Sequence, residues 1–268
     1  MNYIGSRIRQ SLRLNALAVL NLGLLNALRL KYHQYRLHLK PSSQAYCLRS
    51  KYAAHPIWCR PGTTDRQVFN QIYVLREYSC LDNVLGAHLI VDCGANVGYS
   101  SVYFLSRYPN ARVISVEPDP ENIDLLERNL RPFGGRARVV RAAVWSHATR
   151  LMFDTGDGRG EWGIRVRECG ADEPSAFPAV TIGHLLEGSG LPSISILKID
   201  VEGAEAAIFA RDYHDWLSRT DNLVIELHGD KCRESFAAAV LGRPFTVFQH
   251  EELTVCKRSV EGPSVGVS

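Results

Sequence analysis

The fold is decided by the stretch Leu89-Ile-Val-Asp-Cys-Gly-Ala-Asn-Val-Gly-Tyr-Ser100. Its apolar start, Leu89 to Val91, is typical of a parallel strand that is covered on both faces. Gly94 and Gly98 lack a Cβ, so they let the backbone turn tightly and approach a ligand. Asp92 therefore stands at the carboxyl end of a buried strand, which is where open α/β sheets bind small molecules.

A second predicted strand, Arg112 to Glu117, also ends in an acid. Glu117 follows the glycine turn at about the distance of the ribose-binding acid in nucleoside-binding folds. A dinucleotide site requires G-x-G-x-x-G, because its pyrophosphate rests on a helix N-terminus. The pattern here has one glycine fewer and begins with Asp92, which would repel a pyrophosphate but would attract an ammonium group. The pattern therefore favours S-adenosyl-L-methionine, which carries an ammonium, a sulfonium and a ribose diol, over a nicotinamide cofactor.

The cofactor-binding residues expected from this interpretation form one set: Asp92, Gly94, Asn96, Gly98, Glu117 and Ala143. We assign Asp92 to the ammonium and Glu117 to the ribose diol. Asn96 and the backbone around the two glycines would hold the methionine part, and Ala143 would lie beside the adenine. The alternative is that the glycines serve only helix–sheet packing and that Ala143 only packs in a strand.

Two further candidate residues end later predicted strands, Asp200 after Ser193–Ile199 and His228 after Asn222–Leu227. The carboxyl ends of parallel strands meet at one rim, so either side chain could accept the proton of a substrate hydroxyl during methyl transfer. Glu226 shares strand parity with His228, and a carboxylate with an imidazole would also suit a divalent metal. The sequence by itself assigns no metal ligand. Glu202 and Glu205 have a simpler interpretation, as acids that favour a helix N-terminus.

Strands and helices alternate from about residue 88, which predicts a parallel sheet built from βαβ units. The predicted helices span 97–107, 119–130, 181–186, 203–210 and 231–240, and the further strands span 138–144, 244–249 and 253–257. The glycine-rich part from Thr149 to Val180 predicts hairpins and a loop that meets substrate. We expect two domains, a basic N-terminal extension (1–62) and a catalytic domain (63–268).

Residues 1 to 64 contain ten Lys/Arg and no Asp or Glu, although the whole chain has a net charge of only +3. Such an arm suits an anionic partner, and no aromatic–basic interleaving of the RNA-binding kind is visible. The stretch from Ala16 to Leu30 has three interpretations: a helix that caps the fold or lies on an anionic membrane, a mitochondrial targeting segment, or a poor signal anchor. We favour the first and predict no nucleic-acid partner. Seven scattered cysteines favour a reducing compartment, so the expected location is the cytoplasm, with possible membrane association.

Four motifs make the chain resemble the FkbM family of S-adenosylmethionine-dependent methyltransferases over about residues 63 to 250. They are Val91–Ser100, Val116–Pro120, Ala142–Ser146 and Leu197-Lys-Ile-Asp-Val-Glu-Gly-Ala-Glu205, the last together with Ile225–His228. The resemblance implies a class I methyltransferase fold, an α/β architecture with a seven-stranded, mostly parallel sheet and a reversed last strand. It also implies O-methylation of a hydroxyl on a small metabolite, sugar or glycan. Two other hypotheses remain open, a nicotinamide-dependent oxidoreductase and a non-catalytic module that docks to a membrane through its basic arm.

Overall fold

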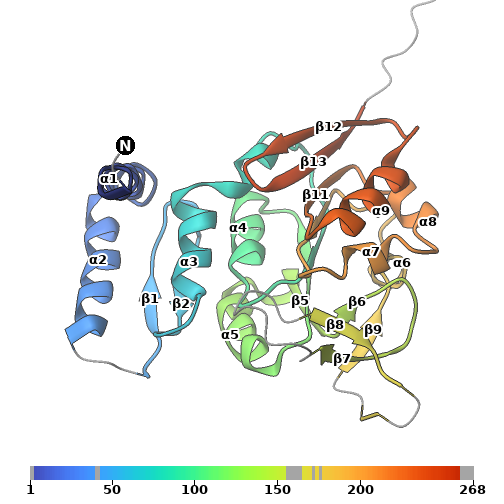
Figure 1. Cartoon of the computed structure of the whole chain (residues 1–268), viewed down its shortest axis with the longest axis horizontal. Helices are drawn as coiled ribbons and strands as arrows, with labels where there is room; N and C mark the ends of the chain where they lie inside the picture. Colours follow the sequence, from blue (N-terminus) through green and yellow to red (C-terminus); the bar gives the residue numbers. More distant parts are fainter. Residues whose placement is uncertain (1–2, 40–42, 155–164, 171–172, 175–176, 260–268) are drawn as a thin grey trace, which may run out of the picture. The chain divides into compact units, whose positions relative to one another are not determined.

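A computed structural model describes residues 3–39, 43–154, 165–170, 173–174 and 177–259. The central sheet has seven strands in the order β12-β13-β11-β10-β3-β4-β5. Figure 1 labels four of them: β5, β11, β12 and β13. Strand β10 runs parallel to both β3 and β11, whereas β13 runs antiparallel to both β11 and β12. This arrangement confirms the predicted class I sheet with a reversed last strand. The chain divides into two compact units: Met1–Gly86 with Ala95–Ser115 and Asp119–Val139, and Ala87–Gly94 with Val116–Pro118 and Val140–Ser268.

The second unit, called the C-terminal unit below, contains most of the sheet. Its strands are β3 (Leu89–Cys93), β6 (Ala143–Val144), β7 (Arg150–Asp154), β8 (Arg165–Glu168), β9 (Phe177–Val180), β10 (Ile196–Ile199), β11 (Asn222–Glu226), β12 (Phe245–His250) and β13 (Leu253–Arg258). Its helices are α6 (Ile182–Glu187), α7 (Glu205–Ile208), α8 (His214–Ser218) and α9 (Asp230–Val240). Helix α6 packs against α8, and α7 against α9.

Strands β3 and β10 form the centre of this unit, and every residue in both strands is buried. Their apolar side chains remove surface from water on both faces, which is why a continuous hydrophobic run was the correct signal for them. The register pairs Ile196 with Ile90 and Lys198 with Asp92. The two strands therefore end at the same edge of the sheet. Asp200 follows β10 there, and the turn at Gly94 follows β3.

The predicted third strand, 138–144, divides into two strands that belong to different sheets. Strand β5 (Ala137–Arg141) is the last strand of the central sheet, with exposed arginines as expected for an edge. Ala143 lies beyond it in β6, which pairs in parallel with β9 in a second, four-stranded sheet. There it packs with Leu151 and Phe177. The antiparallel pairs β7–β8 and β7–β9 agree with the predicted hairpins, whereas the glycines Gly156, Gly158, Gly160 and Gly163 lie outside the described residues.

The first unit, called the N-terminal unit below, is mainly helical. Its helices are α1 (Tyr3–Leu22), α2 (Leu24–Leu39), α3 (Asp65–Phe69), α4 (Tyr99–Arg107) and α5 (Pro120–Leu130). It also contains the π-helix η1 (Asn70–Val74), the 3₁₀ turns η2 (Glu77–Leu81) and η3 (Arg131–Arg136), the hairpin β1 (Tyr46–Leu48) and β2 (Ile57–Cys59), and most of β4 (Arg112–Glu117) and β5. Asp119 caps α5 by accepting a hydrogen bond from Glu121 N at 2.9 Å, and Pro120 occupies the first turn. The helix therefore begins one residue after the predicted start at Asp119.

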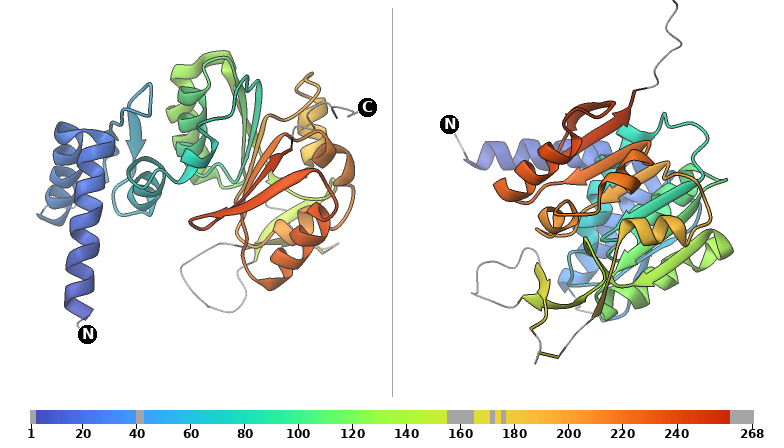
Figure 2. Two further views of the ribbon diagram at one scale, coloured as in Figure 1. Left: turned by 90° about the horizontal axis from the view of Figure 1, so that it is seen from above. Right: turned by 90° about the vertical axis from the view of Figure 1, so that its right-hand side faces the viewer.

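Helices α1 and α2 meet at Gly23, whose left-handed φ of +82° allows the chain to change direction between them (Figure 2). The buried side chain of Asn21 fastens α1 to η1, because its Nδ2 donates to Val74 O at 2.8 Å. Lys51 Nζ donates to Leu20 O at 2.8 Å, which satisfies one of the free carbonyls at the end of α1. The segment 3–39 is therefore folded onto the N-terminal unit.

Candidate active site

Lys198 is the centre of the charged cluster at the rim of the C-terminal unit. Its Nζ lies 3.3 Å from Asp92 Oδ1 and 3.6 Å from Asp200 Oδ2, and it donates to Gly94 O at 2.6 Å. Lys198 is 2% exposed and Asp92 is 0% exposed. Burial alone would lower the pKa of the lysine, but the two carboxylates raise it above its ordinary value. A permanent cation therefore joins the two strand ends and the glycine turn.

Gly94 brings the turn after β3 into direct contact with the end of β10. Its N–H donates to Val116 O at 3.0 Å, its φ is +76°, and a Cβ built on it would lie only 1.8 Å from Asp200 O. Asp200 N in turn donates to Cys93 O at 3.1 Å. No side chain fits in this position, so Gly94 is required for close approach of the two backbones as well as for the turn.

His228 lies in a ring of carboxylates beyond the end of β11. Its Nδ1 lies 2.8 Å from Glu205 Oε1, and its Nε2 lies 3.4 Å from Glu226 Oε1 and 3.5 Å from Glu202 Oε2. The hydrogen bonds with Glu205 and Glu226 raise the pKa of His228 to about 10. At neutral pH the imidazole of His228 is therefore protonated, and both of its nitrogens donate to carboxylates.

Glu205 is the completely buried partner of this histidine. Its Oε1 also accepts from Gly203 N at 3.2 Å, so it closes the turn between β10 and α7. Burial by itself would raise the pKa of Glu205, but hydrogen bonds with His228, Cys232 and the backbone, together with the charge of His228, outweigh burial and lower it. Glu202, in the same turn, has a left-handed φ of +50°, an unfavourable conformation for a residue with a side chain.

Asp200 is the rim carboxylate between these two groups, and 30% of its side chain is exposed. Burial raises its pKa above the ordinary value, against the opposing effect of Lys198. Ligand-type atoms of Asp200, Glu226 and His228 all lie within 4.8 Å of one another, so these side chains could hold a divalent cation. A carboxyl group with a raised pKa is also a better proton acceptor than an ordinary one.

The remaining predicted residues lie in several elements. Asn96 and Gly98, with φ values of +49° and +87°, form the turn before α4 in the N-terminal unit. A Cβ on Gly98 would lie 2.6 Å from a methyl carbon of Leu126, so this glycine also serves helix packing. Glu117 ends β4 in the C-terminal unit and is 6% exposed. The roles predicted for these residues and for Ala143 remain predictions.

A family model described as the methyltransferase FkbM domain matches residues 92–254. The chain belongs to this family. Methyltransferase sdnD of Sordaria araneosa is 36% identical over 190 residues, which cover 59% of this chain and 73% of that protein. The 2-O-methyltransferase NoeI of Sinorhizobium fredii is 28% identical over 166 residues, 56% of this chain and 65% of that protein. A solved structure of a putative caffeoyl-CoA O-methyltransferase from Staphylococcus aureus aligns with a TM-score of 0.45 and 10% identity, covering 87% of this chain and all of that one.

Membership of the FkbM family confirms the predicted class of enzyme, a methyltransferase. S-adenosyl-L-methionine, the predicted cofactor, agrees with this class and with the class I fold. The matched region begins at Asp92 and includes Lys198, Asp200, Glu205 and His228. The charged cluster therefore lies inside the family domain.

The structure gives Lys198 and Glu205 roles that the sequence interpretation did not assign. A signal was present for the lysine, because a charged residue inside the apolar run Ile196–Ile199 must be paired if that run is a buried strand. Glu205 gave no comparable signal, since an acid at the start of a helix is explained by the helix dipole alone. Its contact with His228 depends on the proximity of the ends of β10 and β11.

Proposed function

We propose that the chain transfers the methyl group of S-adenosyl-L-methionine to a hydroxyl oxygen of a small metabolite, sugar or glycan. The observation that carries the proposal is the excess of carboxylates at the rim, where Asp92, Asp200, Glu202, Glu205 and Glu226 accompany only Lys198 and His228. An electronegative rim suits a ligand with an ammonium and a sulfonium. The relative NoeI is itself named a 2-O-methyltransferase, which supports oxygen as the acceptor atom.

The donor set at the rim fits this cofactor better than a nicotinamide dinucleotide. Asp92 would neutralise the ammonium, and Glu117 would accept hydrogen bonds from the ribose diol. Asp92 is completely buried and paired with Lys198, so we assign it an electrostatic effect on the ammonium and the task of holding the turn at Gly94. A pyrophosphate in the same place would face several carboxylates, which disfavours the oxidoreductase alternative.

Asp200 is our proposed proton acceptor. The cofactor, when bound, supplies a methyl group on a positively charged sulfur. The substrate oxygen forms a bond to that carbon while the carbon–sulfur bond breaks, and the hydroxyl proton passes to Asp200. The partial exposure and raised pKa of Asp200 support this role. His228 is already protonated at neutral pH, so its predicted role becomes the orientation of the neighbouring carboxylates.

Calorimetric titration tests the cofactor, with S-adenosylhomocysteine as ligand and NAD as control. We expect saturable binding of S-adenosylhomocysteine alone. Asp92→Asn should weaken that binding at least tenfold, because it removes the charge opposite the ammonium. Asp200→Asn should leave the affinity within about twofold and lower methyl transfer by a factor of about 10² or more. Binding of NAD alone, or equal affinity of the Asp92 variant and the wild type, would contradict the proposal.

Methyl transfer itself is tested with radiolabelled cofactor and a panel of hydroxylated sugars and metabolites. Transfer to an oxygen of one member of the panel would support the assigned substrate class. We also propose that nucleic acid is not the substrate, so a total RNA sample should accept no label. Cofactor binding without transfer to any acceptor would instead favour the non-catalytic module.

A further inference from the structure

Helix α2 exposes a continuous apolar surface, which we call the α2 stripe: Leu24, Leu25, Leu28, Tyr32, Tyr35 and Leu39. Each of these side chains is between 55% and 68% exposed. At about 100° per residue, all six point into an arc of about 100° on the helix. An apolar arc of this width normally faces a protein core.

The α2 stripe is separate from the face by which α2 packs on its own unit. That packing face contains Ala27 and Leu30, which are 6% and 7% exposed and lie on the other side of the helix. Helix α1 also exposes large apolar side chains, Leu12 and Leu20, which are 62% and 66% exposed. Exposed apolar patches of this extent mark interaction sites in soluble proteins.

Basic residues border the α2 stripe on both sides. Arg29 and Arg36, both exposed, lie along one edge of the stripe, and the exposed Lys31 lies along the other edge. Residues 1 to 64 contain no Asp or Glu, so no acid balances these charges within the N-terminal segment. Apolar and aromatic side chains with flanking Lys/Arg are the composition of helices that lie in the interface of a membrane.

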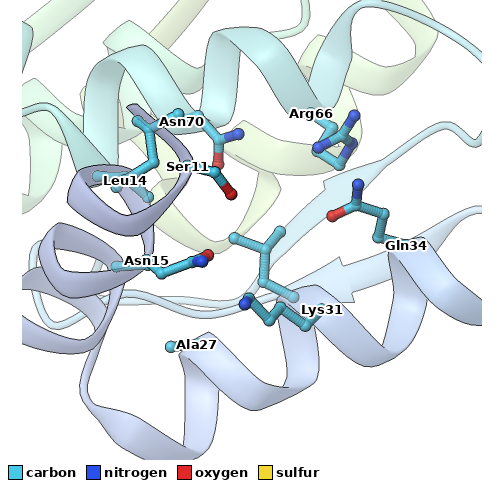
Figure 3. A pocket seen from close by; sticks show the side chains of 11 residues that line it. Ser11, Leu14, Asn15, Ala27, Lys31, Gln34, Arg66 and Asn70 are labelled. Carbon is cyan, nitrogen blue, oxygen red and sulfur yellow. The ribbon is translucent and has the colours of Figure 1, made fainter. Parts of the chain in front are cut away.

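A cavity of about 390 Å³ lies between α1, α2, α3 and η1 (Figure 3). Ala27 and Leu30 are part of its lining, so it lies on the packing face of α2 and not on the α2 stripe. Lys31 and Arg66 line it together with Ser11, Gln34 and Asn70, and its lining includes no acid. Asn70 Oδ1 is buried there and has no hydrogen-bond partner among the described residues. Lys31 and Arg66 therefore make this part of the N-terminal unit positively charged, as the borders of the stripe are.

We propose that α1 and α2 dock the enzyme on a membrane of anionic phospholipid. The α2 stripe enters the boundary between headgroups and acyl chains, and the basic residues that border it face the anionic headgroups. No described helix is long and apolar enough to cross a membrane, so the helices lie on the surface. This proposal does not rest on the proposed function, because it uses residues of the N-terminal unit alone.

A second copy of the chain is the main alternative occupant of the α2 stripe. Leu25, Leu28, Tyr32, Tyr35 and Leu39 follow one another at intervals of three and four residues, the spacing of a coiled-coil seam. The charges disfavour this pairing, because two acid-free helices would bring Arg29 and Arg36 against the same cations of the partner. An anionic surface complements the same charges.

Flotation of the purified chain with vesicles tests the proposal. We expect binding to vesicles that contain phosphatidylglycerol and little binding to vesicles of phosphatidylcholine alone. Leu28→Glu should weaken binding at least tenfold, because it places a charge in the apolar boundary. The matched control is Leu85→Glu, since Leu85 is 92% exposed, belongs to the same unit and lies outside the stripe. The control should bind like the wild type.

A second series tests the charges that border the stripe. Lys31→Gln should weaken binding about fivefold, the loss that corresponds to one cation near an anionic surface. Arg29→Gln should cost about fivefold, and added salt should reduce all affinities. Circular dichroism confirms that each variant keeps its helix content, and sedimentation velocity reports its oligomeric state. Equal vesicle binding by Leu28→Glu and Leu85→Glu would overturn the proposal. So would a wild-type dimer that does not bind vesicles and that Leu28→Glu dissociates.

Discussion

Replacing Lys198 by Met tests whether the buried lysine organises the rim of the active site. The substitution keeps the length of the side chain but leaves Asp92, which is 0% exposed, without the cation that lies 3.3 Å away. Removing one partner of a buried ion pair costs about 3–5 kcal/mol, because the other charge stays buried and uncompensated. Gly94 O loses its 2.6 Å hydrogen bond as well, which adds about 1 kcal/mol. We therefore expect a loss of about 5 kcal/mol in the free energy of unfolding.

Urea denaturation followed by circular dichroism measures this loss, and thermal unfolding should show a decrease of about 10 °C in Tm. The double variant Lys198→Met/Asp92→Asn removes both charges, so its stability should recover by about 2 kcal/mol relative to Lys198→Met. Lys231→Met replaces an exposed lysine on α9 and should change stability by less than about 0.5 kcal/mol. A Lys198→Met protein within about 1 kcal/mol of the wild type would refute the role that we give to this residue.

Three further predictions concern the same rim. Gly94→Ala should destabilise the chain far more than Gly62→Ala. The two glycines have nearly the same φ, +76° and +77°, but only a Cβ at Gly94 would collide with Asp200 O. Thermal unfolding of both variants measures the difference, and equal Tm values would contradict the close contact at Gly94. The pKa of His228 is about 10, above the ordinary 6.5. The difference in the free energy of unfolding between wild type and His228→Gln should therefore be largest below pH 6.5 and should disappear as the pH rises through about 10. Urea denaturation at several pH values measures this difference, and a difference that does not change with pH would refute the ion pair. The ligand atoms of Asp200, Glu226 and His228 lie within 4.8 Å of one another, so treatment with a chelator tests whether these residues hold a metal ion. If Asp200 acts as the proton acceptor without a metal, methyl transfer should survive the chelator. Loss of activity that Mg²⁺ restores would instead make the three residues metal ligands.

The elements of the sheet were predictable because their signals are local. Buried parallel strands are mostly apolar, and β3, β10 and β11 lie where mostly apolar runs occur, although β3 includes Asp92 and β10 includes Lys198. Helix α5 (Pro120–Leu130) lies where a helix was predicted over 119–130. The hairpin of β1 and β2 was not predicted, because each strand has only three residues and such a short segment carries no periodic pattern. The division at Ala142 was missed for a related reason: two buried residues after an edge strand look like its continuation.

The candidate site was predictable only in part, because a sequence shows which residues end strands but not how their side chains pair. Asp92 and Asp200 stood out as acids after buried strands, and the register of β3 and β10 does place those ends at one rim. The protonation state of His228 could not be read from the sequence, since it depends on Glu205 and Glu226, which reach the ring from different elements. A histidine that follows a strand suggests a base, whereas a histidine held between two carboxylates is a cation at neutral pH. The sequence left Asp200 and His228 as candidate proton acceptors. The pairing of His228 with carboxylates in three dimensions favours Asp200.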